Sequence, residues 1–320
     1  MGPAELVRAA AIARLYYLEG RSKKEIGEQY GISRYKVARI LDACLESGLV
    51  RIEINSGAAV DAELSERLRQ AYGLRRALVA TGPFTDLDGL RHALGKVAAD
   101  LLREILTESD VLGVGWGRTL NAMAHHIRDL PPCRIVQMSG VVGAVEASSV
   151  DLVRQLTSVT RGPQYPIYAP LIMSDPQMRV ALSRQPEIAA AMSRWSSITK
   201  AVVAVGSRDR SGSQVYSTLS DRGRVELDAR EVAGEMCAIQ FDAEGREVRT
   251  SFSDRTLAIS YPELRAIDEV IAIAGGREKV HALRAVLVSG TLSSLVTDRE
   301  AATGLIRLAA ADTEDQESRT

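Results

Sequence analysis

The sequence predicts an α/β protein: a small, mainly helical, winged helix-turn-helix domain followed by a large α/β domain. A helix, a glycine turn and a second helix can be read within residues 22–47, and from residue 78 onward short β-branched runs alternate with helical segments. A chain of 320 residues also exceeds the usual size of one hydrophobic core. We therefore expect domains at 1–55 and 76–311, a linker helix at 56–75, and a disordered, acid-rich tail at 312–320.

The helix-turn-helix is predicted from its end signals. Ser22 and Glu25 match a capping box, in which the serine hydroxyl accepts from the Glu25 amide and the glutamate reaches back to the Ser22 amide. Gly31 can take the left-handed conformation that ends this helix, and Ser33 can cap the next one. Beyond that second helix, the alternation over 49–54 predicts a short strand, the wing.

Basic residues gather in this motif although the whole chain carries a net charge of −1. Six basic and two acidic residues lie between Arg21 and Arg39. A compact basic segment on an acidic body suits contact with phosphates, and the first turns of the second helix are those that reach base edges in such motifs. We predict DNA contacts from Ser22, Lys23, Lys24, Ser33, Arg34, Tyr35, Lys36, Arg39 and Arg51.

The large domain should contain a mostly parallel sheet covered by helices. Several of its strands end in glycine, and ligands of such sheets bind at the carboxyl ends of the strands. Glycine after a strand is common whatever the function. However, three such loops, starting at Gly115, Ser139 and Gly275, share this position, and two carry Arg118 or Lys279, which favours an anionic ligand. The expected strands are Leu78–Thr81, Val111–Val114, Arg134–Met138, Ala201–Val205, Met236–Phe241, Thr256–Ile259, Val270–Ala274 and Leu292–Thr297.

Several other classes of protein are disfavoured. No uncharged apolar run approaches the roughly 20 residues that span a bilayer, and the start lacks a secretory pattern, so we expect a cytoplasmic protein without a membrane partner. The dinucleotide fingerprint and the P-loop are absent, and the histidines have no metal-binding spacing, so we expect neither cofactor nor metal. Buried thiols are expected for the three cysteines.

The order of motifs resembles the SorC (sorbitol-operon regulator) family of bacterial transcription regulators, close to DeoR-type sugar repressors. The resemblance covers nearly the whole chain. It rests on the N-terminal motif and on GVGWGRTL at 113–120, IVQMSGVVG at 135–143, YPIYAP at 165–170, GEMCAIQFDAEG at 234–245 and the segment 271–298.

The resemblance implies an effector domain similar to the sugar-phosphate isomerase and CoA-transferase-like fold, without catalysis. It also implies a tetramer, or dimer of dimers, whose affinity for operator DNA changes when a phosphorylated sugar or polyol derivative binds. The effector-binding residues it implies are Gly115, Trp116, Gly117, Arg118, Thr119, Ser139, Gly140, Gly143, Glu235 and Lys279.

Within that set, the resemblance implies that Gly117 and Thr119 contact a phosphate. It also implies that Glu235 accepts from sugar hydroxyls and that Lys279 pairs with the anion. A lysine Schiff base is not expected unless Lys279 supplies it, because no lysine lies between Lys96 and Lys200. Two departures, Val141 and the pair Gly206-Ser207, leave the ligand open. The alternative is a sugar-phosphate isomerase with Glu235 or Asp242 as its base, for which the N-terminal domain would have no use.

Overall fold

The computed structural model describes residues 2–50, 59–82, 84, 86–142, 149–208 and 212–317. The chain divides into two compact units, Met1–Asn55 and Ser56–Thr320. Each unit has a hydrophobic core of its own. Residues 51–54 of the predicted wing, which include Arg51, lie outside the described residues, as does Gly143.

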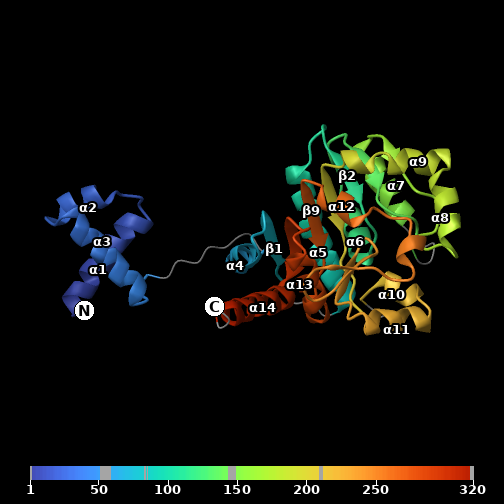
Figure 1. The fold of residues 1–320 in the computed structure, drawn as a ribbon. Helices are drawn as coiled ribbons and strands as arrows, with labels where there is room; N and C mark the ends of the chain where they lie inside the picture. Colours follow the sequence, from blue (N-terminus) through green and yellow to red (C-terminus); the bar gives the residue numbers. More distant parts are fainter. Residues whose placement is uncertain are drawn as a thin grey trace. The chain divides into compact units, whose positions relative to one another are not determined.

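Over residues 2–50, the N-terminal unit contains three helices, α1 (Pro3–Tyr17), α2 (Lys23–Tyr30) and α3 (Arg34–Glu46), drawn in blue in Figure 1. Ile12, Ile26, Val37 and Cys44 are fully buried at their centre. Both predicted helices of the motif are therefore present, and the apolar stripe expected on the second one faces the core.

A seven-stranded parallel sheet forms the centre of the large unit, in the order β1-β10-β9-β5-β2-β3-β4. Six of these strands lie where the β-branched runs predicted strands. The seven strands are β1 (Arg76–Ala80), β2 (Val111–Val114), β3 (Arg134–Gln137), β4 (Gln164–Tyr165), β5 (Lys200–Val203), β9 (Glu269–Ile273) and β10 (Ser294–Asp298).

Helices cover both faces of this sheet, so its strands are buried on both sides and the unit has two apolar cores. One core includes α5 (Leu87–Ile105), α6 (Arg118–His126) and α7 (Ser149–Thr160). The other includes α4 (Ala62–Tyr72), α9 (Pro186–Met192), α13 (Val280–Val288) and α14 (Arg299–Glu317). The shorter helices are α8 (Pro176–Ser183), α10 (Gln214–Thr218), α11 (Asp221–Ala229) and α12 (Tyr261–Arg265).

Two predicted strands are wrong. Residues 236–241 do not form one strand, because Cys237 and Ala238 have φ angles of 52° and 62° and turn the chain between β6 (Gly234–Met236) and β7 (Ile239–Phe241). These strands form an antiparallel sheet with β8 (Glu247–Val248). Residues 256–259 contribute only the isolated bridges of Thr256 and Ala258.

The two ends of the large unit also differ from expectation. The helix α4 is not a separate linker, since Leu64 and Leu68 are buried in the core of the large unit and Ser65 donates to the Asp61 carbonyl while accepting from the Val79 amide. The last helix, α14, continues to Glu317 and so includes most of the segment that we expected to be disordered. None of the described helices is both long and apolar enough to cross a membrane.

Candidate functional site

The turn between α2 and α3 is fixed by hydrogen bonds and by a close approach of backbone. The capping box of Ser22 and Glu25 is formed in both directions, and Ser33 accepts from the Lys36 amide at the start of α3. Gly31 ends α2 with φ of 64°. Gly27 is also required, because a Cβ there would lie 2.6 Å from the Ile32 carbonyl oxygen. Sequence reasoning missed Gly27, which reads as an ordinary helix position.

The exposed face of α3 is basic and aromatic. Arg34, Tyr35, Lys36 and Arg39 are all exposed, and the Tyr35 side chain is 68% accessible although it is large and partly apolar. The Arg34 guanidinium lies 4.9 Å from the centre of the Tyr35 ring and donates to its hydroxyl at 2.9 Å. Because this contact already orders the two long side chains, they lose less conformational entropy when they bind a partner.

The predicted contacts on α2 differ from one another. Lys24 is exposed and lies 3.9 Å from Glu28, whereas Lys23 packs with its ammonium 5.5 Å from the Tyr16 ring centre. Ser22 and Ser33 are exposed, but both hydroxyls cap helices. Of the predicted contacts described in this unit, Lys24 and the four α3 residues are therefore exposed without capping a helix.

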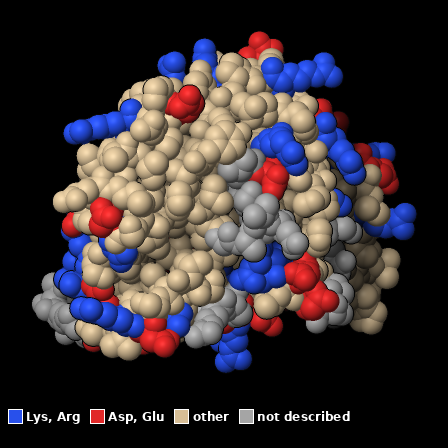
Figure 2. All heavy atoms as spheres, turned by 90° about the vertical axis from the view of Figure 1, so that its right-hand side faces the viewer, with Lys and Arg blue, Asp and Glu red and all other residues tan. Residues whose placement is uncertain are grey.

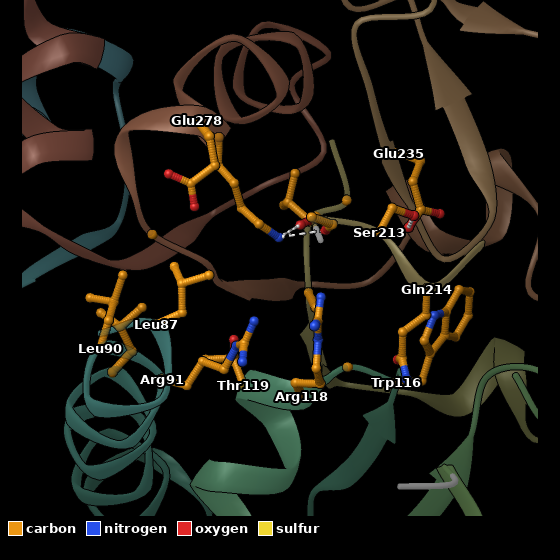
Figure 3. A pocket seen from close by; sticks show the side chains of 18 of the residues that line it. Leu87, Leu90, Arg91, Trp116, Arg118, Thr119, Ser213, Gln214, Glu235 and Glu278 are labelled. Carbon is orange, nitrogen blue, oxygen red and sulfur yellow. Dashed lines mark hydrogen bonds between the residues drawn. The ribbon is translucent and has the colours of Figure 1, made fainter. Parts of the chain in front are cut away.

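The large unit has a pocket at the carboxyl ends of the central strands β9, β5 and β2. Trp116, Gly117, Arg118 and Thr119 line it after β2, and Ala204, Val205 and Gly206 line it after β5. Gly275, Glu278 and Lys279 follow β9. Glu235 and Cys237 belong to the β6–β7 hairpin, and Figure 3 shows Glu235 and Ser213 on one side of the pocket, with Arg91, Thr119 and Arg118 on another.

Six of the ten predicted effector residues line this pocket, namely Trp116, Gly117, Arg118, Thr119, Glu235 and Lys279. The structure does not bring Gly115, Ser139 or Gly140 into it. Gly140 is needed for a different reason, since a Cβ there would lie 2.4 Å from the Pro170 carbonyl oxygen, and Ser139 is fully buried with its hydroxyl bonded to the Gly140 carbonyl. The loop after β5, rather than the loop after β3, completes the pocket.

The first turn of α6 presents backbone amides to the pocket. Gly117 is the N-cap of this helix and, as a glycine, contributes no capping side chain of its own. The φ of Gly117 is 147°, and a Cβ there would lie 2.7 Å from the Ala204 Cβ. The N-terminus of a helix favours a bound group of negative charge. Arg118 and Thr119 place a guanidinium and a hydroxyl at the same end of α6.

The Glu235 side chain is buried, and its environment changes its acidity. Burial raises the pKa of Glu235 to about 7, against the opposing effects of the Lys279 charge and of hydrogen bonds from the Ala238 amide (3.2 Å) and the Ser213 hydroxyl (3.4 Å). Burial also raises the pKa of the neighbouring Cys237 thiol. The carboxyl of Glu235 therefore lies near its titration midpoint at neutral pH, where it can accept from hydroxyl groups.

The ammonium group of Lys279 is engaged by backbone. It donates to the carbonyl oxygens of Val205 and Gly212, the latter at 2.9 Å. The adjoining glycine loop is held by Asp298, whose carboxylate accepts from the Gly276 amide at 2.7 Å. The three cysteines, Cys44, Cys133 and Cys237, are buried and unpaired, which confirms the predicted thiols.

A basic helix-turn-helix and a ligand pocket at the strand ends of an α/β domain together define a class of protein, the ligand-controlled transcription regulator. Comparison with known proteins agrees. A family model described as a putative sugar-binding domain matches residues 58–307. The chain belongs to this family of sugar-binding regulators, that of the SorC type.

Similar proteins include the sorbitol operon regulator of Klebsiella pneumoniae, 28% identical over 304 residues (92% of this chain, 96% of the relative), and the erythritol catabolism regulatory protein EryD of Brucella abortus, 29% identical over 316 residues (96% and 98%). The full-length crystal structure of the Klebsiella regulator SorC superposes with a TM-score of 0.73 at 27% identity, covering 93% of this chain and 98% of that one. The chain is thus a transcription regulator and not an enzyme, and its partners are DNA and a sugar effector.

Proposed function

We propose that this regulator controls a carbohydrate or polyol catabolic operon in the cytoplasm, and that a phosphorylated sugar or polyol in the pocket at β9, β5 and β2 is its effector. One observation supports this most strongly. A single pocket contains a buried carboxyl, Glu235, suited to sugar hydroxyls, and the N-terminus of α6 with Arg118 and Thr119, suited to phosphate.

Each pocket residue has a role in this proposal. Glu235 and Ser213 bind hydroxyl groups of the effector, and Trp116 forms part of the wall. The amide of Thr119 and its hydroxyl bind phosphate oxygens, while Gly117 allows the close approach. Lys279 adds positive charge. Gly115, Ser139 and Gly140 act by shaping the loops behind the pocket.

On the DNA side, α3 enters the major groove with its N-terminal turns. Arg34 and Arg39 bind base edges or phosphates, Tyr35 and Lys36 assist, and Ser22, Lys23, Lys24 and Ser33 contact the backbone of the duplex. Arg51 and Gly143, which lie outside the described residues, keep their predicted roles at the DNA and at the effector. Effector binding shifts the population of DNA-binding conformations, and by linkage DNA must change effector affinity by the same factor.

The assembly in this proposal is a tetramer, a dimer of dimers, as the resemblance to the SorC family implies. Each dimer supplies the two reading helices that two half-sites need. Figure 2 shows a face of the large unit with a broad central area that has few charged side chains. The helix α8, on that side of Figure 1, exposes Met178 (47%) and Val180 (37%). Exposed apolar area of this kind supports association between copies of the chain.

The test is a thermal-shift screen of polyol and sugar phosphates, each beside its unphosphorylated parent, followed by fluorescence anisotropy with operator DNA. We expect at least one phosphate to raise the melting temperature and to change operator affinity, while its parent does neither at equal concentration. Equal stabilisation by phosphate and parent would contradict the phosphorylated effector. A change in stability without any change in operator affinity would contradict the coupling.

A further inference from the structure

A stripe of α5 lines the effector pocket, although sequence reasoning assigned no ligand to this helix. Leu87, Leu90, Arg91 and Leu94 lie at i, i+3, i+4 and i+7, so they share one face of the helix, and all four line the pocket. Leu87 is 44% exposed and Leu94 is buried, so the stripe runs from the pocket mouth to its floor. Arg91 is the charged member of an otherwise apolar wall.

The Arg91 guanidinium is placed between two hollows. The side chain is only 19% exposed, and together with Arg118 it lines both the effector pocket and a neighbouring hollow of about 460 Å³ between α5, α6 and α7. Figure 3 shows Arg91, Thr119 and Arg118 in the same part of the pocket, with the guanidinium groups directed into it. Two guanidinium groups thus adjoin the N-terminus of α6.

The present partner of Arg91 is easily replaced. Within the described part of the chain, its guanidinium donates to Asp88, one helical turn away, at 2.5 Å. The Asp88 side chain is 80% exposed, so water can solvate it once the pair opens, and an ion pair with such an exposed partner contributes little to stability. A phosphate in the pocket offers more oxygens and more charge than Asp88 does.

Resting on the proposed function, we propose that Arg91, acting with Arg118, is the residue that selects a terminal phosphate dianion over a carboxylate in the effector. Lys279 is less suited to this selection, because its ammonium already donates to the Val205 and Gly212 carbonyls. The planar guanidinium of Arg91 can bind two phosphate oxygens at once, which a point charge cannot.

The charge balance of the pocket explains why a dianion is preferred. Arg91, Arg118 and Lys279 oppose the carboxyl groups of Glu235 and Glu278 among the lining residues. Burial favours the neutral form of Glu235, which leaves cationic charge in excess. A carboxylate would compensate part of this excess, whereas a phosphate monoester compensates more of it and supplies three acceptor oxygens. Removing Arg91 should therefore weaken phosphates selectively.

The experiment measures binding by calorimetry for the full chain and for R91A, R91K and R103A. The probes are D-glucitol 6-phosphate, D-erythritol 4-phosphate and D-ribose 5-phosphate, each beside the aldonate of the same carbon chain and its uncharged parent. Arg103 is the matched control: it lies on the same helix and pairs with Asp100 and Asp129 outside the pocket. R91K keeps the charge, and circular dichroism checks that each variant folds.

We expect R91A to weaken binding of the preferred phosphate by about 10- to 100-fold, as the loss of a charge-assisted hydrogen bond implies, and to leave aldonate binding within about threefold. R91K should be intermediate and R103A should match the wild type. Wild-type phosphate affinity in R91A, or an equal loss for phosphate and aldonate, would overturn the role of Arg91 alone. A wild-type chain that binds parents as tightly as phosphates would overturn the proposed function, and the role of Arg91 with it.

Discussion

The exposed face of α3, proposed to contact DNA, and the proposed effector pocket differ in where their residues come from and in how far those residues are buried. On α3, all the candidate contacts lie within Ser33–Arg39, are exposed, and leave the packing of the helix to Val37, Leu41 and Cys44 on its other side. In the pocket, the lining residues come from at least six separate segments, and most of them also pack or cap something. Glu235, for example, holds the Ala238 amide of the hairpin turn.

On α3, the side chains proposed to contact DNA are not the ones that stabilise the fold. In the pocket, the side chains proposed to bind the effector also stabilise the fold. Exposed arginines on α3 can change with little effect on the fold, so operator preference can vary independently of stability. A pocket residue that is buried and hydrogen-bonded cannot change without cost to the unfolding free energy. We therefore expect α3 variants to alter binding alone, and pocket variants to alter both binding and stability.

The largest effect is expected from the double variant R34A/R39A. Each arginine that binds a base or phosphate contributes about 1 to 3 kcal/mol, so the pair should lower operator affinity by at least about 30-fold. The melting temperature of the chain and its effector affinity should stay unchanged. Fluorescence anisotropy at fixed salt measures the first, and calorimetry the second.

Arg14 provides the control for that experiment, because it is exposed and belongs to α1 rather than to α3. R14A should change operator affinity by a small factor through net charge only. Operator affinity in R34A/R39A equal to that of R14A would remove α3 from the interface and break the comparison between the two regions.

An effect of intermediate size is expected from the pH dependence of stability. The pKa of Glu235 is about 7 in the folded chain against 4.5 for an ordinary glutamate, so between these pH values the folded state keeps a proton that the unfolded state releases. The free energy of unfolding must then fall as pH rises from 4.5 to 7, by about 3 kcal/mol at most for this group. E235Q should lack this part of the profile.

Tryptophan fluorescence during urea unfolding measures this effect in the large unit alone, since both tryptophans, Trp116 and Trp195, belong to it. Glu104, exposed on α5, gives the matched control E104Q. Parallel pH profiles for the wild type and E235Q would show that the buried carboxyl is not desolvated as the structure indicates.

The smallest effect on stability is the difference expected between G117A and G290A. Both glycines have positive φ, 147° and 70°, but a Cβ at Gly117 meets Ala204 at 2.7 Å whereas Gly290 has open space. Backbone strain of this kind costs about 1 to 3 kcal/mol, so G117A should lower the free energy of unfolding about 1 to 2 kcal/mol more than G290A. G117A should also abolish effector binding, and equal stability of the two variants would contradict the close approach.

Sequence reasoning succeeded where structure depends on near neighbours. The capping box, Gly31 and Ser33 all act within four residues of the groups they bind, so the helix-turn-helix could be predicted completely apart from Gly27. Most strands of the parallel sheet were predicted because β-branched runs mark them. The hairpin at Cys237-Ala238 was missed, because its left-handed turn contains no glycine or asparagine to announce it.

Prediction of the pocket was partial for a physical reason. A glycine after a strand can allow a ligand or another backbone to approach, and the sequence does not distinguish Gly117, beside the pocket, from Gly140, beside Pro170. The stripe of α5 looks like an ordinary core face, so Arg91 had no signal of its own. Only the strand order places the loops after β9, β5 and β2 together.

The tight contact between Gly27 and the Ile32 carbonyl has a genetic consequence. A missense change at this codon would distort the turn of the reading motif, while the other compact unit, with its own core, would still fold and bind its ligand. In the proposed tetramer such a subunit would assemble with normal copies and lower the affinity of the assembly for the operator. Alleles at position 27 should therefore be dominant over the wild-type gene when both are expressed in one cell.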